Sequence, residues 1–335
     1  MEAPRKILLI RPDRLGDLIL SLPVAETLKK NIPGSEIHYL AASYTAAIAP
    51  MVDYVDGWIL DTDEDGRRLS TGKLAQKIKS GGFDCLIELK SSWRTAAAGF
   101  LSGVRLRVGT SRRAYSLFYT RRINIHRKAS GYHQTELELM HLLPFGFDNI
   151  VTEPHIQVTR SGREKAGLLL NTLTRSFVVI HPGSGGSSPN WSVEKYRELA
   201  ALIKKELDFE IVITDRAEQK SGFENCIDLA GKTDLETLAG VIARAAVFIS
   251  GSTGPMHLAD AIGTPCVSIL SNRADIGPER WGPRRSKSNV IVPSEPCRCP
   301  DLEKCRCLDR ITSAEVLNVI RGVINSDIYR GANRV

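Results

Sequence analysis

The sequence predicts an α/β protein built on doubly wound parallel sheets, one in each half of the chain. Short apolar runs alternate with amphipathic helical segments throughout, which is the pattern of βαβ units. The 335 residues exceed what one hydrophobic core usually supports, and a hydrophobic content of 42% suffices for two cores. Glycine-rich loops follow apolar runs in the second half, as at the strand-to-helix turns of such sheets. We therefore expect two domains, residues 1–155 and 156–335.

The first strand is expected at Lys6–Arg11, where an apolar run ends before Pro12. An amphipathic helix follows and ends near Gly34. Asp17 lies where the loop joins this helix. It is either a carboxylate that complements the helix dipole or a general base at the carboxyl end of the strand. Arg14 and Arg11 in the same loop would keep this carboxylate ionised.

The remaining elements follow the same alternation. In the first half we expect strands at residues 37–40, 58–61 and 83–88, and helices at residues 45–51, 73–80, 94–102 and 133–143. A linker at residues 144–154 leads into the second half, where we expect helices at residues 161–173, 192–206, 234–244 and 312–325, and strands at residues 177–181, 210–214, 247–250 and 290–292. Ser161 with Glu164, and Thr312 with Glu315, have the spacing of capping boxes.

Residues 104–128 carry a concentrated positive charge. Eight Arg and Lys residues occur there without any Asp or Glu, whereas the net charge of the whole chain is +7. Such a run is either a solvated surface or a binding site for phosphate, carboxylate or an anionic membrane surface, to which clustered arginines are suited. Nucleic-acid binding is less favoured, because Tyr115, Phe118 and Tyr119 form one group and no nucleic-acid motif accompanies them.

Two loops in the second half have the composition of phosphate-binding turns. Gly183–Ser187 follows the strand expected at 177–181, and Ser252–Gly254 lies between the strand at 247–250 and a helix with Pro255 in its first turn. The first N–H groups of a helix have no intrahelical partner and lie at the positive end of its dipole, where an anion is stabilised. Each loop alone is also typical of an ordinary βαβ packing turn. The two can converge on one diphosphate if their strands are neighbours in the sheet.

Four of the seven cysteines form two closely spaced pairs near the C-terminus. These residues, Cys297, Cys299, Cys305 and Cys307, could hold a structural zinc ion, although each pair has fewer intervening residues than the usual site. The alternative is four free or reversibly oxidised thiols. The odd, uneven set of cysteines indicates a reducing compartment.

The sequence also argues against several other classes of protein. Residues 1–5 do not resemble a signal peptide, and no apolar run is long enough to span a bilayer. The positive net charge indicates an acidic partner such as an anionic glycan or lipid surface. We therefore expect a protein of the cytoplasm.

Three motifs occur in order along nearly the whole chain. They are Arg11-Pro-Asp-Arg-Leu-Gly-Asp17 with Leu22-Pro23, His181-Pro-Gly-Ser-Gly-Gly-Ser187 with Trp191, and Ser252-Thr-Gly-Pro-Met-His257 with Gly263-Thr-Pro265. Together they resemble the bacterial glycosyltransferase family 9, whose best-known members are lipopolysaccharide heptosyltransferases. The resemblance implies a GT-B fold, in which two Rossmann-like doubly wound domains face across a cleft. It further implies that the N-terminal domain binds the acceptor, that the C-terminal domain binds the nucleotide-sugar, and that the last helix crosses back onto the first domain.

The resemblance also implies a reaction. It is an inverting transfer that requires no metal or other cofactor, from ADP-L-glycero-D-manno-heptose to the lipopolysaccharide core, an anionic glycolipid, at the cytoplasmic face of the inner membrane. Asp17 matches the family's proposed catalytic base, and the residues expected to contact the donor are Gly183, Ser184, Gly185, Ser187, Glu218, Ser252, Thr253, Gly254 and His257. His257 is alternatively a core histidine. For the acceptor we expect contacts from Arg14, Arg112, Arg113, Arg121 and Arg122, and we expect no nucleic-acid partner.

Two positions depart from the family's pattern. Many members have a lysine where this chain has Pro189, and an aspartate where it has Ser252. The changes indicate a different donor sugar, compensation by another residue such as Arg216, or a weakened enzyme, and of these we favour altered donor recognition over loss of activity. A transferase that uses another nucleotide-sugar is the alternative enzyme, and a non-catalytic protein that binds anionic glycans or membrane surfaces is the alternative outside enzymes.

Overall fold

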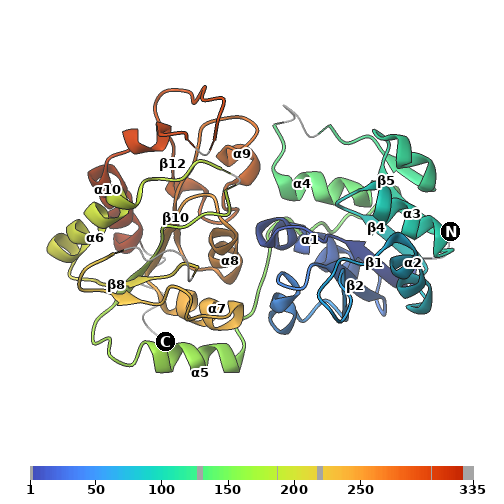
Figure 1. Cartoon of the computed structure of the whole chain (residues 1–335), viewed down its shortest axis with the longest axis horizontal. Helices are drawn as coiled ribbons and strands as arrows, with labels where there is room; N and C mark the ends of the chain where they lie inside the picture. Colours follow the sequence, from blue (N-terminus) through green and yellow to red (C-terminus); the bar gives the residue numbers. More distant parts are fainter. Residues whose placement is uncertain (1–2, 127–130, 187, 217–221, 303, 327–335) are drawn as a thin grey trace. The chain divides into compact units, whose positions relative to one another are not determined.

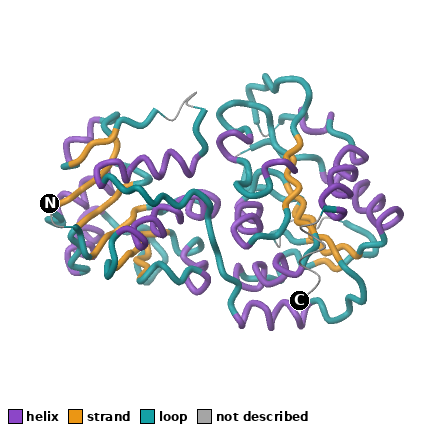
Figure 2. The backbone as a smooth tube through the Cα atoms, turned by 180° about the vertical axis from the view of Figure 1, so that it is seen from behind, coloured by secondary structure: helices purple, strands orange, loops and turns teal. Residues whose placement is uncertain are grey.

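A computed structural model describes residues 3–126, 131–186, 188–216, 222–302 and 304–326 of the chain (Figure 1). The chain divides into two compact units, Met1–His155 and Ile156–Val335. Each unit contains a six-stranded sheet in which the described pairings are parallel. Helices flank the strands in both units (Figure 2). The predicted class, α/β with doubly wound parallel sheets, is therefore confirmed.

The first sheet has the strand order β3-β2-β1-β4-β5-β6, so the winding of the chain reverses between β1 and β4. The strands are β1 (Lys6–Ile10), β2 (Glu36–Ala41), β3 (Gly57–Leu60), β4 (Cys85–Glu88), β5 (Leu106–Thr110) and β6 (Arg121–Ile123). In β1 the side chains from Ile7 to Ile10 are fully buried, as in a parallel strand covered on both faces. Its last residue pairs with Leu40 on one side and Glu88 on the other. β5 and β6 lie in the basic stretch, where the arginines obscure the short apolar pattern and no strand was expected.

Helices cover both faces of the first sheet. They are α1 (Leu15–Asn31), α2 (Thr71–Ser80), α3 (Trp93–Leu101) and α4 (Gln134–Leu139), with the 3₁₀ helices η1 (Ala46–Met51), η2 (Ala114–Phe118) and η3 (Met140–Phe145). α1 packs against α4, and α2 packs against α3 over a core that includes Leu8, Leu40 and Leu74. The helices expected at 45–51 and 133–143 are wholly or partly 3₁₀ in form, and each 3₁₀ segment contains a proline, which removes a backbone donor.

The second sheet repeats the arrangement of the first. Its order is β12-β11-β10-β7-β8-β9, so the reversal lies between β7 and β10. The strands are β7 (Phe177–His181), β8 (Glu210–Ile213), β9 (Ile227–Asp228), β10 (Val247–Ser250), β11 (Cys266–Ile269) and β12 (Val290–Ile291). β7 and β10 are buried along their whole length and are hydrogen-bonded neighbours, with Ser250 opposite His181.

Two layers of helices cover the second sheet. The helices are α5 (Arg160–Leu169), α6 (Val193–Leu207), α7 (Leu235–Arg244), α8 (Gly254–Ile262), α9 (Pro278–Trp281) and α10 (Ser313–Asn325), with η4 (Lys287–Asn289) and η5 (Cys307–Arg310). α5 packs against α7, and α7 against α8, while α6 and α10 lie side by side (Figure 1). α10 begins with the expected capping box of Thr312 and Glu315. The N-cap of α5 lies two residues earlier than expected, because Thr159 rather than Ser161 accepts the capping hydrogen bond.

The last helix differs from the expectation that it crosses to the first unit. The apolar side chains of α10, including Val316, Leu317 and Ile320, are buried in the core that α6 also covers. Residues 313–325 are therefore part of the second unit.

The last residue of β4, Glu88, has a buried side chain. Glu88 is fully buried and accepts a hydrogen bond from the hydroxyl of Tyr119. The ring of Tyr119 reaches this position because Gly109 in β5 has no side chain, and a Cβ at that position would lie 2.4 Å from the ring. Burial raises the pKa of Glu88 to about 7, although hydrogen bonds to Thr95 and Tyr119 act in the opposite direction. Tyr119 is therefore an interior residue.

Replacing Glu88 by Gln should flatten the pH dependence of stability. Between the ordinary pKa of this carboxyl and its value of about 7, the folded protein holds a proton that the unfolded chain releases, so the free energy of unfolding falls as pH rises through this window. We expect Glu88→Gln to remove a decrease on the order of 2 kcal/mol, as measured by urea unfolding between about pH 5 and pH 8. Glu164→Gln at an exposed carboxyl is the control. An unchanged slope in Glu88→Gln would contradict the assignment.

Candidate functional site

The first candidate site lies at the carboxyl ends of β1 and β4. Arg11 directly follows β1, and its backbone N–H donates to the carbonyl of Leu40 at 2.9 Å, which extends the ladder between β1 and β2. The side chain of Arg11 is only 1% exposed. Its Nη1 donates to the carbonyl of Leu89, just beyond β4, at 3.2 Å. The guanidinium group is therefore fixed below the surface between the two strands.

Three carboxylates surround this guanidinium. Nη2 of Arg11 lies 2.5 Å from Asp17, Nε lies 3.1 Å from Asp13, and Nη1 lies 3.3 Å from Glu138. Glu138 is fully buried on α4, so the packing of α4 against α1 completes the cluster. Lys90, after β4, adds a second cation 3.8 Å from Asp13. Each buried charge thus has at least one opposite charge beside it.

The cluster shifts the protonation of two of its members. Burial would lower the pKa of Arg11, but Glu138, Asp13 and Asp17 raise it above the ordinary value. Burial raises the pKa of Asp13 to about 6, although Arg11 acts in the opposite direction. Arg11 is thus a permanent cation, and Asp13 titrates slightly below neutral pH.

Asp17, like the similarly exposed Asp13, has access to solvent, and Arg11 fixes its orientation. It lies in the first turn of α1, where its charge complements the helix dipole, and its side chain is 19% exposed. It does not act as an N-cap: the capping position is Arg14, whose side chain makes no capping hydrogen bond and is exposed. A carboxylate held by a buried guanidinium, with part of its surface accessible, can accept a proton from a bound hydroxyl group.

The predicted acceptor arginines lie on the surface of the first unit. Arg112, Arg113, Arg121 and Arg122 are exposed, and Arg112 contacts Asn124 and His126. Arg121 and Arg122 belong to β6, the edge strand, where positive charge also prevents pairing with another sheet.

An exposed apolar patch lies on α3 and η2, two elements in contact with each other. We define this aromatic patch by Trp93, Phe100 and Leu101 of α3 and Leu117 of η2, whose exposed fractions range from 51% to 76%. The rings of Trp93 and Phe100 both contact Phe118, and Arg107 lies over the ring of Phe100. Large apolar side chains that cluster at the surface beside arginines mark an interaction site.

The second candidate site lies at the carboxyl ends of β7 and β10. These strands are adjacent, so the condition for convergence of the two glycine-rich loops is met. The loops also touch: Asn190 donates to the carbonyl of Pro182 within its own loop, and a Cβ on Gly251 would lie 2.8 Å from Oδ1 of Asn190. Gly251 therefore permits the close approach of the second loop to the first.

The N-terminus of α8 presents backbone donors beside these loops. Thr253 is the N-cap, and its hydroxyl accepts from the N–H of Met256 at 3.2 Å. Pro255 has no N–H, whereas Gly254 retains its own, at the positive end of the helix. Ser252 and Gly254 are half-buried, so this turn is partly open to a ligand.

A charged pair after β8 contacts the first loop. A Cβ on Gly183 would lie 2.1 Å from the carboxylate of Asp215, so only glycine fits at this position. The carboxylate of Asp215 therefore lies against the first glycine-rich loop. The guanidinium of Arg216 would lie 3.9 Å from a Cβ on Gly185. A cation therefore lies beside the loop.

The other predicted donor residues differ in their positions. Ser184 is half-buried and accepts from the N–H of Gly186 at 3.4 Å. His257 is buried one turn into α8, a position compatible with either a core or a functional role. Trp191 is buried and donates to the carbonyl of Ile311 at 3.1 Å, so its role is structural. Ser187 and Glu218 lie outside the described residues.

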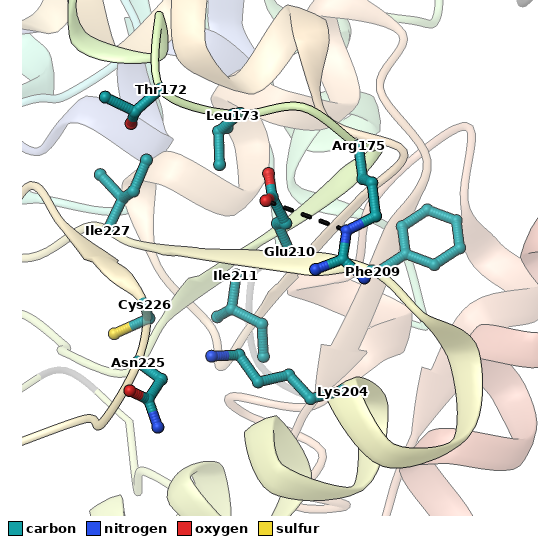
Figure 3. A pocket seen from close by; sticks show the side chains of 10 residues that line it. All are labelled: Thr172, Leu173, Arg175, Lys204, Phe209, Glu210, Ile211, Asn225, Cys226 and Ile227. Carbon is teal, nitrogen blue, oxygen red and sulfur yellow. Dashed lines mark ion pairs between the residues drawn. The ribbon is translucent and has the colours of Figure 1, made fainter.

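A separate pocket of about 330 Å³ lies at the opposite edge of the second sheet. It is lined at the amino ends of β8 and β9 by Glu210, Ile211 and Ile227, with Arg175 paired to Glu210 (Figure 3). The glycine-rich loops follow the carboxyl ends of β7 and β10, so this pocket is not the donor site.

Sequence reasoning missed three charged residues of these sites. Glu138 was hidden within an expected helix, where only its occurrence between two leucines marks it as a charge on an apolar segment. Lys90 follows β4, and Asp215 follows β8; a search for charged residues directly after each strand would have found both.

Comparison with known proteins identifies the family. The model of glycosyltransferase family 9 (heptosyltransferase) matches residues 71–309. The chain is 28% identical over 297 residues to a Haemophilus influenzae protein named provisionally as a glycosyltransferase, a match that covers 83% of this chain and 86% of the other. It is 24% identical over 316 residues to lipooligosaccharide heptosyltransferase 2 of Haemophilus ducreyi, covering 86% and 88% of the two chains.

Solved structures show the same fold. A family 9 glycosyltransferase from Veillonella parvula matches with a TM-score of 0.83 at 22% identity, over 97% of this chain and 98% of that one. Escherichia coli heptosyltransferase WaaC with ADP matches with a TM-score of 0.70 at 20% identity, over 95% and 99%. Both sheets described above therefore belong to the GT-B architecture. Because the family model covers more than half of the sequence, the chain belongs to glycosyltransferase family 9, a family of transferase enzymes.

Proposed function

We propose that this protein is an inverting glycosyltransferase that moves a heptose from ADP-L-glycero-D-manno-heptose to the inner core of lipopolysaccharide. The observation that carries the chemistry is the partly exposed carboxylate of Asp17, held 2.5 Å from the buried guanidinium of Arg11. Relatives named as heptosyltransferases support the choice of sugar, and the WaaC structure with ADP supports the choice of nucleotide.

In this reaction Asp17 is the general base. It accepts the proton of the acceptor hydroxyl while the hydroxyl oxygen attacks the anomeric carbon of the heptose. The bond from this carbon to the diphosphate oxygen breaks on the opposite face, so ADP leaves and the configuration inverts. Arg11 holds the Asp17 carboxylate in position, and it is itself held by the carbonyl of Leu89.

The departing diphosphate requires positive potential, for which the second unit offers two sources. The N-terminus of α8 supplies backbone donors and the positive end of a helix dipole. Arg216 supplies a full charge beside Gly185. Together they can stabilise the leaving group without a bound metal ion, so we propose that transfer requires none.

We assign the exposed arginines and the aromatic patch of the first unit to binding of the acceptor and of the membrane. No helix within the described residues is both long and apolar enough to cross a bilayer. We propose instead that the aromatic patch enters the lipid interface while the adjacent arginines bind anionic head groups and core phosphates. In this proposal the enzyme acts as a peripheral protein at the cytoplasmic face of the inner membrane.

Another nucleotide-sugar is the second candidate donor. It is favoured by Ser252, which occupies the turn before α8 in place of the family's aspartate, and by Pro189, which is buried and carries no charge. Preference for UDP or GDP over ADP would support this alternative.

Asp17→Asn should abolish turnover while leaving donor binding intact. The amide cannot accept the acceptor proton, so we expect kcat to fall by about 10²–10⁴-fold with an unchanged Kd for ADP. Rates measured with ADP-heptose and a lipopolysaccharide core acceptor, and calorimetric binding of ADP, test this. Asp148→Asn, at an exposed aspartate of the same unit, is the control and should retain both properties. Normal turnover in Asp17→Asn would remove Asp17 from the mechanism.

Calorimetry with ADP, UDP and GDP tests the donor assignment. We expect the wild-type protein to prefer ADP and to bind it equally well in the presence of a chelator. Arg216→Gln should weaken ADP binding by about tenfold, because a charge-assisted contact to a phosphate is lost, and Arg216→Lys should restore part of it. Arg160→Gln, whose side chain is 93% exposed, should bind as the wild type does. A chelator that abolishes binding would instead indicate a metal at the diphosphate.

Removing the four exposed arginines should weaken binding to anionic vesicles. We expect replacement of Arg112, Arg113, Arg121 and Arg122 by Ser to lower partitioning into phosphatidylglycerol-containing vesicles by at least tenfold at low salt, in sedimentation assays. The matched control removes the same charge from another exposed surface of the unit, with Ser at Arg67, Lys73, Lys77 and Lys79. Equal losses in both variants would indicate an effect of net charge alone, and unchanged binding would refute the membrane assignment.

A further inference from the structure

Four cysteine sulfurs meet between β12 and α10. Sγ of Cys297 lies 3.5 Å from Sγ of Cys305, and Sγ of Cys299 lies 3.5 Å from Sγ of Cys307. All four sulfur atoms lie within 4.8 Å of one another. Each of these two close contacts thus joins one cysteine of the first pair, Cys297 and Cys299, to one of the second pair, Cys305 and Cys307.

The spacing of these sulfurs is that of a metal site. A disulfide would need a separation of about 2.05 Å. Four thiolates bound to one tetrahedral ion by bonds of about 2.3 Å would be separated by about 3.8 Å, between the shortest and longest separations found here. Small movements of the side chains would therefore close the site around an ion.

The cysteines of each pair converge although only one residue separates them. Between Cys305 and Cys307 the backbone turns at Arg306, with φ −110° and ψ 14°, and Cys307 begins η5. The residues between them, Arg298 and Arg306, are exposed, whereas the cysteines are buried or half-buried. The unusual spacing noted in the sequence is thus compatible with four convergent ligands.

The loop after β11 fixes the first pair. Oδ1 of Asn272 accepts from the N–H of Cys297 at 2.8 Å, and Nη1 of Arg273 donates to the carbonyl of Cys299 at 3.0 Å. Asn272 also donates to the carbonyls of Pro293 and Glu295. These bonds hold the backbone around the ligands independently of any ion.

We propose that Cys297, Cys299, Cys305 and Cys307 bind one structural divalent cation, zinc or ferrous iron. Soft thiolate ligands in tetrahedral arrangement select these ions. The four thiols lose their protons on binding, and no electron transfer is involved. Since the site would have four protein ligands, it leaves no position for a substrate and serves structure rather than catalysis.

The bound cation would stabilise the segment that holds the first glycine-rich loop. Between Cys297 and Ile311, the residues that the structure describes form one short 3₁₀ helix, η5. The end of this segment contacts the start of α6: Asp309 accepts from the N–H of Ser192 at 3.0 Å, and Ile311 accepts from Trp191. A cation that fixes this segment therefore also supports the loop that ends at Trp191. This consequence, unlike the metal site itself, rests on the proposed role of that loop in donor binding.

Metal analysis of the full-length protein is the direct test. Protein purified under reducing conditions and transferred to metal-free buffer should retain about one zinc or iron per chain, measured by elemental mass spectrometry. Titration with a mercurial should release the ion as four thiols react. Replacement by cobalt should produce the visible absorption of a tetrahedral thiolate site. A chain that takes up none of these ions, or whose intact mass shows two disulfides in place of four thiols, would overturn the proposal.

Two variants separate the site from general effects of cysteine loss. Cys299→Ser with Cys307→Ser, at the two half-buried positions, should lose the ion and unfold at lower temperature. Cys226→Ser, at a half-buried cysteine outside the cluster, should retain the ion. If the double variant fails to fold, the cobalt spectrum and metal content of the wild type still decide. Neither readout uses nucleotide or acceptor, so failure of the donor assignment would leave the metal result unaffected.

Discussion

The sites of both units depend on the reversal of winding between two adjacent parallel strands, β1 with β4 and β7 with β10. At such a point the connecting helices leave toward opposite faces, so the carboxyl ends of the strands remain uncovered and their loops can face a ligand. Arg11 and Lys90 follow the two strands of the first unit, and the two glycine-rich loops follow those of the second. One topological constraint therefore places the acid–base cluster and the proposed diphosphate loops.

The two sites use opposite electrostatics. In the first, a buried cation lies among three carboxylates, so its members are charged groups held by one another. In the second, most of the donors are neutral backbone N–H groups. The nearby cation, Arg216, also interacts with the carboxylate of Asp215. This division suits a reaction in which one partner loses a proton and the other departs as an anion. For the exposed arginines and the aromatic patch we propose a different task, attachment to an anionic surface.

The sequence predicted most elements because its apolar runs are short and end at glycine, proline or capping residues. The strand expected at 247–250 is β10, and the helix that Asp234 caps is α7. Asp17 was found for the same reason, since it lies beside the end of the first strand. Glu138 was not, because its role depends on the packing of α4 against α1, which no local pattern encodes. The convergence of the four cysteines likewise depends on the path of an irregular segment that follows no periodicity.

A different kind of dependence links Gly109, Tyr119 and Glu88: a substitution at one position changes the effect of substitutions at the other two. A side chain at position 109 would displace the tyrosine ring, and loss of the tyrosine hydroxyl would leave the buried carboxyl without that donor. Once one of the three residues has changed, the contributions of the other two to the free energy of unfolding change as well. The effects of separate substitutions on stability are therefore not additive. The three positions therefore form an epistatic set, in which a lineage that replaces one residue is expected to replace the others.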